Sequence, residues 1–240
     1  MNDRSPMPVL VLALAIVLSA WLIGRGIERF RAADRSVSVK GVAERTVQAD
    51  VGLWPLRMVS ADNDLEIAQR KITHDRHTVL AFLARFGLDS TATELQGFEV
   101  ADTRANPYQN SVGANRFIIT TTLMVRTGEP DRIRQASQRV SDLVAAGVVL
   151  TSGGPGYGGP TYLFTRLNDL KPEMLAEATA NARKAAGEFA RQSGSRIGAI
   201  KRAQQGFFEI LPRDPAPGVM QEGQIQKTLR VVATIDYELK

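Results

Sequence analysis

Cysteine is absent from this chain of 240 residues, which excludes disulfide bonds, thiolate catalysis and zinc sites built on cysteine. Histidine is scarce, with two residues in the chain. His74 and His77 are three apart in an expected helix and point away from its apolar face, which favours surface side chains over metal ligands. Ser141 and Ser152 lie in no GxSxG motif and have no histidine to activate them, so serine catalysis is not expected either.

Charge of one sign is not concentrated anywhere in the sequence. Thirty Lys and Arg residues against 25 Asp and Glu residues give a formal net charge of +5. The basic residues are scattered, and aromatic residues make up 6% of the chain. Because nucleic-acid-binding surfaces gather their basic residues into a patch or stripe, we expect no nucleic-acid partner.

Long hydrophobic runs are limited to one, at the start of the chain. No charged residue occurs from Ser5 to Gly24. Twenty helical residues reach about 30 Å, the thickness of the bilayer hydrocarbon. We expect Val9 to Ile23 to span the membrane and contact lipid, so residues 1–35 form an anchor and juxtamembrane segment, and residues 36–240 form the following domain. A cleaved signal peptide is the alternative, although only Arg4 precedes the run and no small-residue cleavage site is well placed.

The charges beside the apolar run leave the topology open. Four arginines follow the run and one precedes it, which favours a cytoplasmic domain by the positive-inside rule. A long folded domain can cross the membrane regardless of such charges. The arginines that follow are Arg25, Arg29, Arg31 and Arg35.

After the anchor, strands and helices alternate. Apolar residues recur at every second position in the expected strands and on one face of the expected helices. Pro55 cannot donate to a ladder and indicates an edge or a bulge near Trp54. The expected strands are Val37 to Leu53 (a pair or one bent strand), Glu94 to Ala101, Arg116 to Arg126, Thr161 to Leu167, Ile197 to Gln205 and Thr228 to Leu239. The expected helices are one capped by Asp62 or Asn63 and ending at about Phe86, one from Pro130 to Gly147 and one from Pro172 to Ser193, with Leu83 and Phe189 in the core.

Two pairs of tripeptides indicate an internal duplication, although chance matches are the alternative. Asn-Asp-Leu opens both long helices, at residues 63–65 and 168–170, and Gln-Gly-Phe follows each helix, at residues 96–98 and 205–207. We therefore predict an α+β fold with two repeated strand-helix-strand-strand halves and antiparallel sheet, preceded by one N-terminal transmembrane helix.

Chemical motifs are few. Residues 154–159 match GxGxxG, but a strand and not a helix follows them, which favours a loop over a phosphate site. Glu173 and Glu177 occupy the first turns of a helix, where acidic residues balance the helix dipole. Asp50 lies within a strand and needs a partner, for which an arginine or a turn amide is expected. We assign no catalytic, cofactor-binding or metal-binding residue.

Three segments resemble the SIMPL-domain family: VSVKGVAERTVQAD (Val37 to Asp50), RFIITTTLMVRT, and PEMLAEATANARKAAGEFARQSGSRIGAI. Gly41, Glu44 and Asp50 occupy the places of the family's opening signature. The chain departs from the family at Gln48-Ala49-Asp50, where many relatives have proline before the aspartate, and in the loop Gly153 to Pro160. The resemblance implies a bacterial envelope protein without established catalytic residues; some such proteins form rings and some are linked to stress tolerance.

We therefore expect a non-enzymatic, single-pass inner-membrane protein with its C-terminal domain in the periplasm. It would act by forming a homo-oligomer or by binding another protein, which the sequence does not identify. The resemblance also implies a role in envelope or oxidative stress tolerance. The alternative is a ligand-binding or hydrolytic envelope protein with its site in loops 103–115 and 153–160. Convergence of these loops on a concave pocket would favour that alternative.

Overall fold

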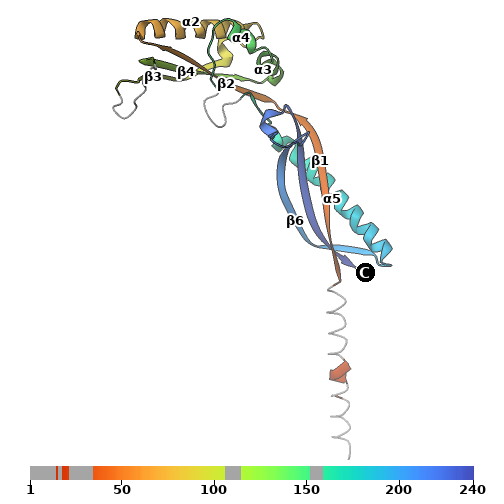
Figure 1. Cartoon of the computed structure of the whole chain (residues 1–240). Coiled ribbons are helices and arrows are strands. Elements are labelled where there is room, and N and C mark those ends of the chain that lie inside the picture. The colour runs from red at the N-terminus through yellow and green to blue at the C-terminus, as the bar shows by residue number, and fades with distance from the viewer. Residues whose placement is uncertain (1–14, 16–17, 22–34, 106–114, 152–158) are drawn as a thin grey trace, which may run out of the picture. The chain divides into compact units, whose positions relative to one another are not determined.

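The computed structural model describes residues 15, 18–21, 35–105, 115–151 and 159–240. They form an α+β fold with two antiparallel sheets, ordered β3-β4-β2-β5 and β1-β7-β6 (Figure 1). The strands are β1 (Ser36–Gln48), β2 (Val51–Asp62), β3 (Thr93–Asp102), β4 (Phe117–Thr127), β5 (Thr161–Leu163), β6 (Ile197–Pro212) and β7 (Gln226–Leu239). The helices are α2 (Leu65–Ala84), α3 (Pro130–Ser137), α4 (Ser141–Ala145) and α5 (Leu167–Gln192), with short 3₁₀ turns η1 (Ser90–Ala92) and η2 (Gln221–Gly223).

The predicted membrane segment, Val9 to Ile23, lies outside the described residues except at 15 and 18–21. Among the helices that the structure does describe, none combines the length and the apolar character needed to cross a bilayer.

The chain divides into two compact units. Among the described residues, one unit contains those within Arg45–Lys171 and Glu209–Leu229, and the other contains residues 35–44 together with Pro172–Phe208 and Arg230–Lys240. The four-stranded sheet dominates the first unit, where β2 pairs with β4 from Gly52↔Thr127 to Asp62↔Phe117. Helix α2 lies along one face of this sheet (Figure 1).

Helix α2 begins at Leu65, close to the predicted start, but its cap is Asp64 and not the expected Asp62 or Asn63. Asp64 caps it by accepting hydrogen bonds from the backbone N–H groups of Glu66 and Ile67. Gly87, with φ of 72°, follows its last turn in the left-handed conformation that glycine adopts without strain. Leu83 is fully buried, so its predicted place in the core is confirmed. The core between α2 and the sheet includes, from the helix, Ala68, Ile72, Val79 and Phe82, and from the strands, Trp54, Leu56, Met58, Ile119, Leu123 and Val125.

Pro55 lies within β2, which continues to Asp62. It pairs with Met124 of β4 on one side. On the other side, β5 pairs with β2 only as far as Leu53, and the next backbone bonds join Arg57 and Val59 to residues 151 and 149. The ring therefore lies between two paired stretches, where the absent N–H breaks no bond of the described ladder.

In the other unit, α5 packs against β1 and β7. A Cβ atom built on Gly41 of β1 would lie 1.9 Å from the backbone oxygen of Ala178 and 2.4 Å from the nitrogen of Ala182. Only glycine permits this approach. The buried row of α5 is accordingly one of small residues and a methionine: Met174, Ala178, Ala182, Ala186 and Ala190. Phe189 is 53% exposed, so its predicted place in the core is wrong.

The second half differs from expectation in several places. Helix α5 begins at Leu167 and not at Pro172, and β6 continues past Gln205 to Pro212. Strand β5 ends at Leu163, because the Asp50 carboxylate accepts the Thr165 N–H and turns the chain toward α5. The helix expected from Pro130 to Gly147 is two helices, α3 and α4. Strand β5 joins the four-stranded sheet, while the three-stranded sheet takes β1, so the strands of each sheet are not all consecutive in sequence.

Candidate functional site

Several hydrogen bonds hold the junction of β1 and β2, at the end of the segment from Val37 to Asp50. The Asp50 carboxylate accepts hydrogen bonds from Thr165 N at 2.8 Å and Thr165 Oγ1 at 3.0 Å. The Nε atom of Arg166 lies 3.4 Å from Asp50 Oδ2, and the Asp50 side chain is 17% exposed. The backbone N–H of Ala49 donates to Ile225. The expected pairing of Asp50 with an arginine or a turn amide is confirmed, and both partners are present.

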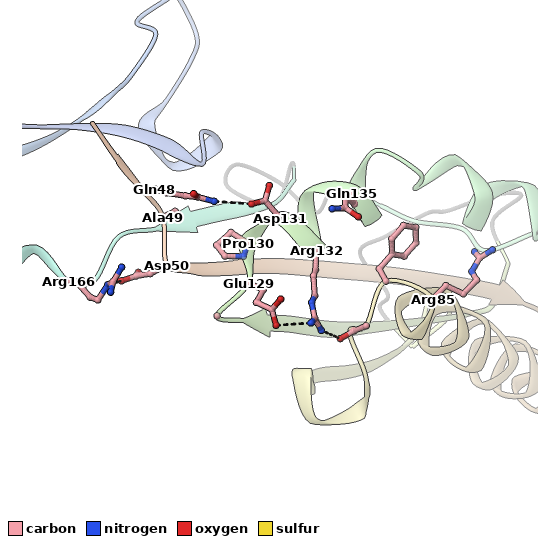
Figure 2. Close-up of a pocket in the computed structure, with 13 residues that line it drawn as sticks. Gln48, Ala49, Asp50, Arg85, Glu129, Pro130, Asp131, Arg132, Gln135 and Arg166 are labelled. Atoms are coloured by element: carbon pink, nitrogen blue, oxygen red, sulfur yellow. Dashed lines mark hydrogen bonds and ion pairs between the residues drawn. The ribbon is translucent and has the colours of Figure 1, made fainter. Parts of the chain in front are cut away.

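A broad open depression of about 800 Å³ lies beside this junction (Figure 2). Four segments bring side chains to it: the β1–β2 junction, the residues that follow α2, the turn from β4 into α3 with the start of α3, and Arg166 just before α5. The polar residues that line it are Gln48, Asp50, Arg85, Glu129, Asp131, Arg132, Gln135 and Arg166.

The charged groups of the depression bind one another. Arg132 donates to the Gly87 carbonyl at 2.8 Å and lies 2.8 Å from Glu129 Oε1. Gln48 donates to Asp131 at 2.9 Å, and Arg134 lies 2.8 Å from the other oxygen of Asp131. The described lining includes carboxylates and arginines but no serine, histidine or lysine. The bond from Arg132 joins α3 to the turn that follows α2, and the bond from Gln48 joins α3 to the end of β1.

The other chemical candidates do not come together. His74 and His77 are exposed on α2, Ser141 begins α4, and Glu173 and Glu177 are exposed on α5. Within residues 35–105, 115–151 and 159–240, no group of three or more metal-ligating side chains occurs. Ser152 lies outside the described residues, as do most of the GxGxxG stretch and of the loops 103–115 and 153–160.

The feature that the sequence did not predict is an exposed apolar row on β3. The row consists of Leu95, Phe98 and Val100. Their direct partners on β4 are Leu123, Thr121 and Ile119, and these three partners are buried. Side chains of directly paired residues share a face of the sheet. The apolar row of β3 therefore continues the core face of the sheet.

The row is nonetheless open to solvent. Leu95 is 48% exposed, Phe98 is 51% exposed and Val100 is 46% exposed. Strand β3 ends the order of its sheet, and α2 packs mainly on β2 and β4. The register shifts between Leu95 and Gly97, which changes the phase of alternation and brings Leu95 and Phe98 to one face. The glycine inside the expected strand is the sequence signal for this bulge.

Strand β6 is an edge of the same kind. It ends the order of the three-stranded sheet, and the side chains from Ala199 to Gln205 are exposed. Ile200 is 52% exposed and Phe207 is 93% exposed. Each sheet of the described chain thus ends in a long strand with exposed large apolar residues. Such surfaces in soluble domains mark contacts with other molecules.

Comparison with known proteins agrees with the motifs in β1, β4 and α5. No curated protein matches this chain. The family model described as SIMPL, protein of unknown function (DUF541), matches residues 37–236, which include both sheets, α2 and α5. Since this match covers most of the sequence, the chain belongs to the SIMPL family.

Proposed function

We propose that this protein is a non-enzymatic module of the bacterial envelope that acts by self-assembly. The observation that carries the proposal is the apolar row Leu95, Phe98 and Val100. It extends the core face of the four-stranded sheet onto an edge strand that α2 does not cover. An added strand would pair with the backbone of β3 and remove part of the row from water.

The paired charges of the depression beside Asp50 also favour an assembly role over catalysis. The described polar groups there are engaged mainly with one another, whereas an active site needs groups aimed at a substrate. The exposed strand edges, in contrast, have backbone groups available for pairing.

We further propose that the uncharged N-terminal run anchors the protein in the inner membrane as a single span, with the C-terminal domain in the periplasm. The length of the run and the family membership support this arrangement. A membrane anchor confines the copies to a plane and raises their effective concentration, so a weak interface would be occupied. A role in envelope or oxidative stress tolerance is consistent with the family resemblance.

An internal duplication would give the chain two equivalent edges. The orders β2-β4-β3 and β1-β7-β6 match when β1 is taken as the counterpart of β2. The helices α2 and α5 and the strands β3 and β6 are then equivalent. The Gln-Gly-Phe tripeptides lie within the edge strands β3 and β6, and the Asn-Asp-Leu tripeptides lie at the starts of α2 and α5. This topology supports a repeat in which the second unit takes β1 in place of the expected strand Thr161 to Leu167.

Sedimentation velocity of the full chain in detergent tests the proposal. Wild-type protein at tens of micromolar should contain oligomers, and Phe98→Ser combined with Val100→Ser should reduce them. Phe189→Ser is the matched control, because Phe189 is 53% exposed and Phe98 is 51% exposed, yet Phe189 lies on helix α5. A monomer at every concentration of wild-type protein would contradict self-assembly and favour binding of another protein.

A further inference from the structure

We infer that β3 of one copy pairs with β6 of a second copy, so that the two sheets join edge to edge. This inference rests on the proposed self-assembly and names the two surfaces that meet. Both strands end their sheets in the described chain. They have 10 and 16 residues, long enough for an extended ladder. Both carry large exposed apolar residues, Phe98 on β3 and Phe207 on β6.

The charge on β3 is wholly acidic. The strand TELQGFEVAD contains Glu94, Glu99 and Asp102 and no basic residue. Asp102 is held within its own chain by Arg116, at 3.1 Å. The direct partners of Glu94 and Glu99 on β4 are Met124 and Thr120, which lie on the same face of the sheet. Because of the bulge, both glutamates therefore lie on the face opposite the apolar row. Strand β3 therefore presents an apolar face and an acidic face to an incoming strand.

The exposed part of β6 carries the complementary charge. Lys201 and Arg202 lie in its exposed stretch, and the first acidic residue of the strand is Glu209. Adjacent residues of a strand point to opposite faces of the sheet. One of the two cations therefore reaches the face of Glu94 and Glu99 whichever face of β6 is presented. Opposite charges on neighbouring strands stabilise the pairing and fix its register.

The same charges disfavour the symmetric alternative. Two copies of β3 side by side would bring acidic residues together, and like charges directly opposite each other destabilise a sheet. Pairing of β3 with β6 avoids this repulsion. Each copy offers one β3 edge and one β6 edge, so the contact is head-to-tail. Repetition of such a contact produces a closed ring or an open chain.

A charge exchange tests the inference with the full chain in detergent. The first variant combines Glu94→Lys with Glu99→Lys, and the second combines Lys201→Glu with Arg202→Glu. In a sample of either variant alone, β3 and β6 would carry charges of the same sign and would repel each other. We expect its association to weaken on the order of tenfold. An equimolar mixture restores opposite charges at each contact between the two variants and should recover oligomers in which the variants alternate. Glu66→Lys and Arg183→Glu, on exposed faces of α2 and α5, are the controls and should leave association unchanged.

Cysteine crosslinking supplies a second measurement that tolerates a change in stability. The chain has no native cysteine, so Val100→Cys in one copy and single cysteines at residues 199–205 in another give a clean background. Mixed disulfides between the two variants should form at alternate positions, since a disulfide requires Cβ atoms about 3.5–4.5 Å apart. Efficient crosslinking of Val100→Cys with itself, or no crosslinking with any β6 position, would contradict the β3–β6 contact.

The outcomes separate this inference from the proposal on which it rests. If wild-type protein forms oligomers and both charge variants do so equally well, the β3–β6 contact is wrong and self-assembly stands. If the variants fold, as judged by circular dichroism, and the mixture fails to recover oligomers, the contact is likewise wrong. If wild-type protein is monomeric, both the inference and the proposed function fail.

Discussion

Replacement of Gly41 by alanine should destabilise the unit built on the three-stranded sheet more than any surface substitution. The added Cβ would lie 1.9 Å from the Ala178 carbonyl oxygen, well inside the C···O contact of about 3.3 Å that close carbon–oxygen pairs adopt. The opposing atoms belong to the backbone of α5 and cannot turn aside as a flexible side chain would. Asn181 adds to the constraint, because it donates to the Val42 carbonyl at 2.9 Å and ties α5 to β1.

The helix must therefore move away from β1 or the strand must bend. Overpacking of a core with side chains costs about 1–3 kcal/mol, and a clash with backbone belongs at or above the upper end of that range. We expect Gly41→Ala to lower the free energy of unfolding by at least about 3 kcal/mol. Urea denaturation of the full chain in detergent, followed by far-ultraviolet circular dichroism, measures the change.

Gly187→Ala is the matched control on the same helix. A Cβ at Gly187 meets no atom within 4 Å, so alanine there only raises helix propensity. We expect stabilisation of about 0.5–1 kcal/mol. Equal unfolding midpoints for Gly41→Ala and the wild-type protein would refute the close approach of α5 to β1.

Three further predictions concern individual side chains. Leu83→Ala should cost about 2–5 kcal/mol of stability, whereas Phe189→Ala should change it by less than about 0.5 kcal/mol, as thermal denaturation can measure. Hydrogen bonds from Arg116 lower the pKa of Asp102, so their stabilisation is present above pH of about 4 and is lost as pH falls through the folded-state pKa. Acid titration of Asp102→Asn should show a shallower loss of stability than that of the wild-type protein. Burial lowers the pKa of Lys227, so the unfolded chain binds the proton more tightly than the folded chain does. The free energy of unfolding should therefore rise as pH increases toward about 10.4, the ordinary pKa of lysine. Lys227→Met should abolish this rise, as urea titrations at alkaline pH can measure.

Local signals in the sequence predicted several elements well. The apolar face from Leu65 onward and the glycine at 87 located α2 to within a few residues. Asp50 was expected to need an arginine or a turn amide, and it has both. These features depend on neighbours in sequence or on the cost of burying a charge, which residue types alone reveal.

Features set by distant partners could not be predicted in this way. The apolar stripe of α5 includes both Phe189 and the alanines, and only the approach of Gly41 decides that the small row faces β1. The three residues of β5 pair with β2, a choice that no local pattern encodes. The exposed row of β3 depends on the bulge before Gly97, which changes the phase of the strand.

Sedimentation velocity of the full chain in detergent, from about 1 to 100 µM, tests the central claim of self-assembly most directly. Oligomers should form with rising concentration, because each copy presents the exposed edges β3 and β6. Their population should fall when Phe98 and Val100 are both replaced by serine. A single monomeric species across the whole range, in a protein that is folded by circular dichroism, would contradict the claim.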